Sequence, residues 1–237
     1  MKARLPPRYE RNYKTISLED QDKLAKSTIA IVGCGGLGGT MAEEFARLGV
    51  GRLILVDGDI IEESNLNRQL FSTENNIGVK KVEAARQRLK AVNSEVKLTL
   101  FDGWFNENNA QTIFQGADLV CDALDSIQRR IELESACHKL NKPLVYAGIA
   151  GWFGMLGVSF PGDLSVLHVF KDGKESDRGM EKTWGNPAFT PWVLSSLSVA
   201  EAVKIIVGRE PALRYAWLQV DLLYMEFEIF EISNRPE

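Results

Sequence analysis

The stretch Thr28 to Gly38, TIAIVGCGGLG, decides the fold of this chain of 237 residues. Its first five residues are mostly β-branched and apolar, which is typical of a strand buried within a parallel sheet. Gly33, Gly35 and Gly38 then follow the pattern GxGxxG, in which the backbone approaches a phosphate at the N-terminus of the next helix. The stretch predicts a strand, a phosphate-binding turn and a helix, and it fits a dinucleotide and ATP equally well.

Strands and helices continue to alternate on both sides of this stretch. Ser17 and Asp20 form a capping-box pattern that begins a short helix ending near Lys26. We expect further helices at 37–48, 80–92, 106–114 and 127–140, and strands at 52–57, 96–101, 118–124 and 143–149. This alternation predicts an α/β fold with a Rossmann-like, mostly parallel sheet and helices on both faces.

The pattern changes after Gly151. We expect antiparallel strands at 153–160 and 165–170, a mobile polar loop at 171–185, a helix from Thr190 to Val207, and a terminal hairpin around Leu222 and Leu223. The chain is therefore divided into an N-terminal arm and helix (1–27), a nucleotide-binding core (28–150) and an antiparallel extension (151–237). We expect all three parts to form a single structural unit.

Composition excludes several classes of function. A formal net charge of −4 and a pI near 5.4 argue against a nucleic-acid partner. We find no signal peptide and no apolar run of the ~20 residues that a membrane span needs, so a soluble cytoplasmic protein without a membrane partner is expected. The three cysteines form no CxxC pair, which predicts that no zinc site is present. The basic segment Lys2 to Lys14 is either a solvated tail or an arm that reaches an anionic ligand.

A second stretch, Glu63 to Phe71 (ESNLNRQLF), points to the ligand. Asn65 and Arg68 lie three residues apart, so a helical turn would place them on one side, just beyond Asp57 at the end of the second strand. Lys81 begins the next helix, and Asp125 ends a later strand. Because the carboxyl ends of parallel strands gather at one edge, these side chains could converge on one nucleotide. Two cations, an amide and carboxylates suit a triphosphate with Mg²⁺.

Simpler interpretations of the same residues remain open. Arg68 could be a surface residue, Lys81 a solvated helix start, and Asp125 an N-cap for the helix at 127. A nucleotide-dependent oxidoreductase would use the same glycine turn, but it would leave Arg68, Lys81 and Asp125 without a role.

Taken together, six segments resemble one family. They are RYERN, GCGGLGG, LVDGDIIEESNLNRQ, IGVKKVEAAR, DALDS and PWVLSSLSVAEAVKIIVG. From about Arg8 to Gly208 the chain resembles the ThiF/MoeB/HesA proteins, which are relatives of ubiquitin-activating enzymes. The resemblance implies an adenylyltransferase that uses ATP and Mg²⁺. Its partner would be a small ubiquitin-like sulfur-carrier protein ending in Gly-Gly, whose carboxylate is joined to AMP with loss of pyrophosphate.

The resemblance also implies roles for individual residues. Asp57 would hold the ribose, Asp125 would position Mg²⁺, and Arg11 is similar to the arginine that family homodimers lend across the subunit interface. The implied catalytic residues are Arg68, Asp125, Lys81 and Arg11. The implied nucleotide-binding residues are Gly33, Gly35, Gly36, Gly38, Asp57, Asp59, Asn65, Arg68, Gln69, Lys81 and Asp125.

The chain departs from the family in two respects. Without CxxC pairs it resembles a zinc-less variant, and without a cysteine at 171–185 it cannot form a thioester in that loop. Trp152 and Phe153 either line a groove for the Gly-Gly tail or serve only for packing. Two other functions stay open: adenylation of another carboxylate, on a peptide or linked to tRNA, and a non-catalytic subunit that binds a ubiquitin-like protein.

Overall fold

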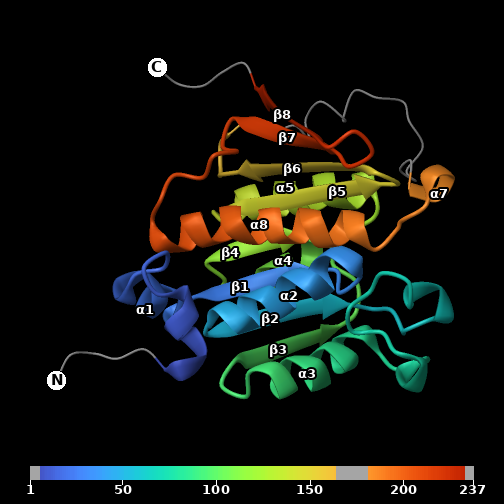
Figure 1. Ribbon diagram of the computed structural model, residues 1–237, viewed down its shortest axis with the longest axis horizontal. Coiled ribbons are helices and arrows are strands. Elements are labelled where there is room, and N and C mark those ends of the chain that lie inside the picture. The colour runs from blue at the N-terminus through green and yellow to red at the C-terminus, as the bar shows by residue number, and fades with distance from the viewer. Residues whose placement is uncertain (1–5, 164–180, 233–237) are drawn as a thin grey trace.

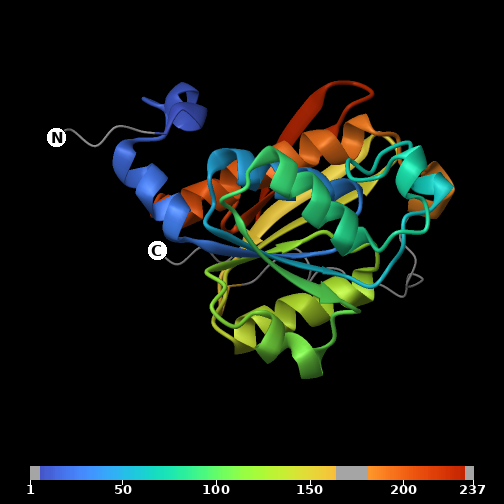
Figure 2. The same ribbon diagram turned by 90° about the horizontal axis from the view of Figure 1, so that it is seen from below.

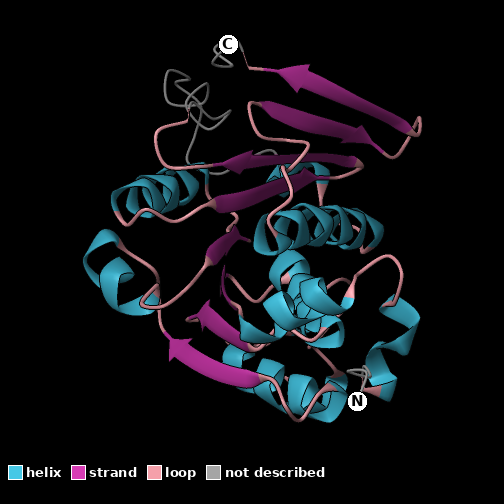
Figure 3. Cartoon of the chain, turned by 90° about the vertical axis from the view of Figure 1, so that its left-hand side faces the viewer, coloured by secondary structure: helices cyan, strands magenta, loops and turns pink. Residues whose placement is uncertain are grey.

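The computed structural model describes residues 6–163 and 181–232. Within them, one eight-stranded sheet runs through the whole molecule in the order β3-β2-β1-β4-β5-β6-β7-β8 (Figures 1 and 3). The strands are β1 (Thr28–Val32), β2 (Arg52–Asp57), β3 (Lys97–Asp102), β4 (Leu119–Asp122), β5 (Leu144–Ala150), β6 (Phe153–Ser159), β7 (Ala216–Asp221) and β8 (Glu226–Glu231).

The sheet has a parallel part and an antiparallel part. β1 to β5 pair in parallel, and β6, β7 and β8 extend the same sheet in antiparallel pairs. β1 lies between β2 and β4, so the chain changes direction across the sheet at the end of β1, which is where open α/β sheets bind ligands. The predicted Rossmann-like fold with an antiparallel extension is confirmed, whereas the strand predicted at 165–170 lies outside the described residues.

The helices cover both faces of the sheet. α2 (Gly36–Leu48), α3 (Lys81–Val92) and α8 (Phe189–Val207) lie on one face, and α4 (Glu107–Ile113) and α5 (Ile127–Lys139) lie on the other (Figure 2). α1 (Leu18–Lys26) contacts α8. Short 3₁₀ turns occur at η1 (Pro7–Asn12), η2 (Glu63–Asn65) and η3 (Glu74–Asn76).

Part of the predicted loop at 171–185 is helical. Residues 171–180 lie outside the described residues, but Glu181–Trp184 form the short helix α7, which the sequence did not predict. The amide of Gly151 donates to the carbonyl of Gly185 at 2.8 Å, so the end of this segment is fastened to the β5–β6 turn.

Strand β1 is buried on both faces because its residues alternate between two cores. Ile29 and Ile31 belong to the core beneath α2 and α8, whereas Ala30 and Val32 belong to the core beneath α4 and α5. Burying a side chain of the size of Ile or Val stabilises a fold by about 1.5–3 kcal/mol. The packing of β1 therefore fixes the position of the glycine turn that follows it.

Helix α8 is the helix predicted from Thr190 to Val207, and it begins one residue earlier, at Phe189. It has 19 residues, and its most apolar stretch has a mean hydropathy of 1.3, so by length and composition it could cross a membrane. Half of that stretch, however, is buried inside the protein. It packs against α2, β5 and β6, and its Ser195 hydroxyl donates to the carbonyl of Leu37 at 2.9 Å. In this fold α8 is a core helix.

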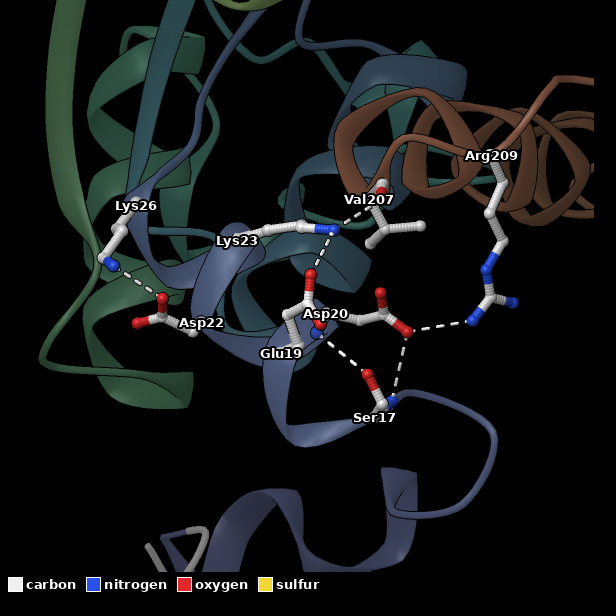
Figure 4. A network of polar contacts seen from close by, with 8 residues as sticks. All are labelled: Ser17, Glu19, Asp20, Asp22, Lys23, Lys26, Val207 and Arg209. Carbon is white, nitrogen blue, oxygen red and sulfur yellow. Dashed lines mark hydrogen bonds and ion pairs between the residues drawn. The ribbon is translucent and has the colours of Figure 1, made fainter.

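Helix α1 is fastened to the C-terminal end of α8 by a polar network (Figure 4). The amide of Asp20 donates to the Ser17 hydroxyl at 3.0 Å, and the Asp20 carboxylate accepts from the Ser17 amide and from Arg209, at 3.2 and 2.9 Å. The Lys23 ammonium donates to the carbonyl of Val207 at 3.0 Å. The predicted capping box is confirmed, and its acidic member also joins two elements that are distant in sequence.

Candidate active site

Two glycines of the turn after β1, Gly33 and Gly38, cannot be replaced by residues with a side chain. Gly33 has a φ of +100°, and a Cβ atom there would lie 2.5 Å from the carbonyl oxygen of Ala123. A Cβ atom at Gly38 would lie 1.9 Å from the carbonyl oxygen of Gly33. Gly35 is the N-cap of α2. Gly35 and Gly36 leave the start of α2 without side chains, and the positive end of the helix dipole favours an anion there.

A cleft of about 680 Å³ opens at the carboxyl ends of the parallel strands, in front of this turn. We call it the strand-end cleft. It is lined by predicted residues from the ends of β1, β2 and β4 and from the start of α3. These are Gly33, Gly35, Gly36, Asp57, Asp59, Asn65, Arg68, Gln69, Lys81 and Asp125. Gly38 lies behind the turn, where its role is the close packing of α2.

Asp57 is buried at the end of β2 and braces the glycine turn. Its Oδ2 accepts from the amide of Cys34 at 2.7 Å, and its Oδ1 accepts from the amide of Asp59 at 2.8 Å. Each carboxylate oxygen has a second lone pair, so the same group can also accept from a ligand hydroxyl. Asp57 thus holds the turn in shape while it faces the cleft.

The stretch after β2 places Arg68 at the rim of the cleft. Asn65 is buried, and its Oδ1 accepts from the amide of Glu62 at 3.1 Å, which closes the turn η2. The Arg68 Nη1 donates to the carbonyl of Ser64 at 3.0 Å and to the Oδ1 of Asn67 at 2.9 Å. Among the described residues, the Nη2 and Nε of Arg68 donate to no protein acceptor, so these groups can serve an anionic ligand.

Lys81 is not the solvated helix start that a simpler interpretation allowed. It is buried, and its ammonium lies 2.8 Å from the Oδ2 of Asp59. The carboxylate of Asp59 is half-exposed and also lines the cleft. The pair keeps a cation in place beside the glycine turn, and Asp59 is its counter-ion before any ligand binds.

Asp125 is exposed in the cleft, three residues beyond the end of β4. The N-cap of α5 is Ser126, whose hydroxyl accepts from the amide of Arg129 at 3.4 Å, so the interpretation of Asp125 as the N-cap is wrong. Among residues 6–163 and 181–232, no group of three or more His, Cys, Asp or Glu side chains could hold a metal ion. The single carboxylate of Asp125 is enough to hold Mg²⁺, because Mg²⁺ takes most of its other ligands from phosphates and water.

The sequence pattern of the ThiF family matches residues 9–237. The chain belongs to the ThiF family. It is 34% identical over 208 residues to the heterocyst protein HesA of Trichormus variabilis. The aligned region covers 87% of this chain and 77% of that protein.

Two further matches bear on activity and on fold. The sulfur carrier protein ThiS adenylyltransferase of Escherichia coli K12 is 34% identical over 197 residues, covering 82% of this chain and 78% of that protein. The crystal structure of E. coli MccB superposes with a TM-score of 0.83 at 24% identity, covering 97% of this chain and 70% of that one, which shows a common fold. This ThiF family member is an ATP-dependent nucleotidyltransferase.

Sequence reasoning missed two residues of this ThiF family site. Trp104 lines the cleft two residues after β3, and its indole covers Gly58, where a Cβ atom would lie only 2.7 Å from the ring. Its position after a parallel strand was a usable signal. Asn186 also lines the cleft, and its carbonyl accepts from the Asn67 side chain at 3.0 Å. Nothing in the sequence indicated that this segment returns to the site.

Arg11 does not reach the cleft of its own chain. The arm is fixed near the amino ends of β1, β2 and β3, opposite the cleft. There the Asn93 side chain donates to the Tyr9 hydroxyl at 3.0 Å and contacts Arg8. Figure 1 shows the arm at the left and the segment after β2 at the right. Arg11 is exposed within η1, so it could act in catalysis only at the site of another copy.

Proposed function

We propose that this enzyme adenylates the C-terminal carboxylate of a small ubiquitin-like sulfur-carrier protein ending in Gly-Gly. The proposal is carried by one observation: Arg68, the Lys81–Asp59 pair and Asp125 surround one cleft in front of the glycine turn. Support for the substrate class comes from the family and from the printed name of the E. coli relative, which acts on the sulfur carrier protein ThiS.

The donor set fits ATP together with Mg²⁺. The α2 amides and the Lys81 and Arg68 cations would face the phosphates, and Asp57 would accept from the ribose. Asp125 would hold the metal, which when bound neutralises charge on the phosphate oxygens. Trp104, whose indole is 61% exposed at the rim, offers an apolar face to the base.

The reaction needs no nucleophile from the protein. An oxygen of the carrier carboxylate attacks the α-phosphorus, the bond from that phosphorus to the bridging oxygen breaks, and pyrophosphate leaves. The protein contributes by positioning and by neutralising the charge that develops. Burial raises the pKa of the Cys34, Cys121 and Cys137 thiols, so none of them supplies a reactive thiolate, and adenylation alone is proposed for this chain.

Aromatic residues beside the cleft suit the approach of the Gly-Gly tail. The rings of Trp152 and Phe189 lie 4.4 Å apart, and those of Phe153 and Trp184 lie 5.4 Å apart. A fifth aromatic residue, Trp192, borders the site, because its indole donates to the carbonyl of Arg68 at 3.2 Å. Because glycines lack side chains, a Gly-Gly end could pass alongside these ring pairs and reach the α-phosphate.

The proposal includes a homodimer in which Arg11 of one copy completes the site of the other. Its support is the fixed arm, which holds Arg11 exposed and away from its own cleft. A peptide or tRNA-linked carboxylate and a non-catalytic partner subunit are the alternatives. A nicotinamide oxidoreductase is disfavoured because it gives no role to the convergence of Arg68, Lys81 and Asp125.

The test is ATP–pyrophosphate exchange with Mg²⁺ and a panel of small proteins that end in Gly-Gly. We expect exchange to depend on one carrier and to fall about 10³-fold or more in Arg68→Ala, because arginines at transferring phosphates contribute about 10³–10⁵ in rate. Arg86→Ala is the matched control, since Arg86 is half-exposed and pairs with Glu83 on the outer surface of α3. A fully active Arg68→Ala enzyme would contradict the assigned site.

A further inference from the structure

A second charged cluster, which the proposed reaction does not use, is buried directly behind Asp125. Arg130 comes from the first turns of α5 and is 6% exposed, while Asp122 ends β4 and is fully buried. Charges are expensive to bury, and replacing a buried ion pair by apolar residues often stabilises a protein. A stability role alone therefore does not account for a buried pair at this place.

The contacts of the pair converge on the turn that carries Asp125. We call residues 123–126 the Asp125 turn. Asp122 accepts from the amide of Leu124 at 2.8 Å, and Arg130 donates to the carbonyl of the same residue. Leu124 is thus held through both its N–H and its C=O groups. Asp125 is the next residue along the chain.

Arg130 also anchors the turn to the neighbouring strand. Its Nη1 donates to the carbonyl of Ala147 in β5 and lies 3.6 Å from the Oδ2 of Asp122. A Cβ atom at Gly148 would lie 3.4 Å from that same nitrogen, so the guanidinium is packed closely against β5. One rigid, planar group therefore fixes the Asp125 turn relative to the sheet.

The pKa of Asp122 is raised in the folded protein, and burial is the largest cause. The charge of Arg130 opposes this rise, whereas the buried Glu134 one turn further along α5 adds to it. Arg130 therefore offsets part of the cost of burying Asp122. Removing Arg130 alone would leave that carboxylate uncompensated.

We propose that Arg130 and Asp122 are positioning residues, which clamp Leu124 so that the Asp125 carboxylate meets the metal of the bound nucleotide. This inference rests on the proposed function, in which Asp125 holds Mg²⁺. Groups that orient a metal ligand in this way typically change metal affinity or activity by about 10–100-fold when they are mutated.

The test measures ATP affinity by calorimetry in Mg²⁺ and in EDTA, and the ratio of the two affinities is the Mg²⁺-dependent gain. Arg130→Lys keeps the charge but cannot span both carbonyls, so we expect its gain to fall about ten-fold or more. The EDTA affinity should stay within about two-fold of wild type, because the clamp acts only through Asp125. Asp125→Asn should lose the gain, and Arg130→Lys/Asp125→Asn should lose no more than Asp125→Asn does.

Two further variants separate positioning from folding. Arg129→Lys is the matched control, because Arg129 is half-exposed on the same helix, and its gain should equal that of wild type. Arg130→Met/Asp122→Asn removes both buried charges and the Arg130 contacts of the clamp, while the Asn oxygen can still accept from the Leu124 amide. It should therefore unfold in urea near the wild-type midpoint and still show the reduced gain.

The outcomes distinguish a failure of the positioning role of Arg130 and Asp122 from a failure of the proposed function. If Arg130→Lys and Arg130→Met/Asp122→Asn fold and keep the Mg²⁺-dependent gain in ATP affinity of wild type, this inference is overturned and the proposed function stays intact. Equal losses of affinity in Mg²⁺ and EDTA would also overturn it, because they indicate general damage. Wild-type protein that binds no ATP in either condition would overturn the proposed function and the inference with it.

Discussion

The partly buried ion pair between Lys81 and Asp59 permits a quantitative prediction for Lys81→Met. Methionine has a similar length and shape, so the change removes the charge with little disturbance of packing. The pair spans 2.8 Å, but the Asp59 side chain is 47% exposed and can hydrate when it loses its partner. Since partly exposed pairs contribute about 0–1 kcal/mol, we expect the melting temperature to fall by no more than about 2–4 °C.

The effect on the reaction should be much larger. An ammonium at about 4 Å from a phosphate charge, at an effective dielectric constant of about 20, contributes roughly 4 kcal/mol. We therefore expect kcat/KM for ATP–pyrophosphate exchange to fall by up to about 10³-fold. The matched control is Lys80→Met, because Lys80 pairs with Asp102 at 3.2 Å and both side chains are half-exposed. A Lys81→Met enzyme within about five-fold of wild type, or a loss of activity equal to that of Lys80→Met, would refute the reasoning.

Three further predictions concern Asp57, Gly38 and Asp20. Asp57→Ala should weaken ATP binding in calorimetry, because it removes the acceptor proposed for the ribose and the bond from the Cys34 amide that braces the glycine turn; unchanged affinity would contradict this. Gly38→Ala should yield little folded protein by circular dichroism, because its Cβ atom would lie 1.9 Å from the carbonyl oxygen of Gly33. Burial raises the pKa of Asp20, but hydrogen bonds from Ser17 and the charge of Arg209 outweigh burial, so the pKa in the folded state is lowered. The stability that Asp20 contributes is therefore present above its ordinary pKa of about 3.9 and is lost as pH falls through the lower folded value. Urea unfolding of Asp20→Asn against wild type should show a difference at pH 7 that shrinks below that range, and a difference that grows with acid would refute it.

Elements whose packing leaves a local pattern could be predicted from the sequence. Strand β1 is buried on both faces, so its apolar run was sufficient to identify it, and the capping box at Ser17 marks the start of α1. The convergence of Asp57, Arg68, Lys81 and Asp125 was also predictable, because parallel strands present their carboxyl ends at one edge.

Features that depend on contacts between distant segments could not be predicted. The counter-ion of Lys81 is Asp59, which lies 22 residues earlier in the chain. Helix α7 is a single turn, too short for a periodic pattern, and Asn186 reaches the site only because this segment folds back toward it. Arg130 follows Arg129 in sequence, and only the packing of α5 distinguishes the buried arginine from the half-exposed one.

The most direct test of the central claim follows the α-phosphate of ATP. The enzyme, Mg²⁺ and a carrier that supports exchange are incubated with ATP labelled at that phosphate, and the carrier is then analysed by mass spectrometry. The account predicts one AMP group on the C-terminal carboxylate of the carrier, and none on a carrier that lacks its last two glycines. Label that stays in ATP, or that appears on the shortened carrier, would contradict the claim.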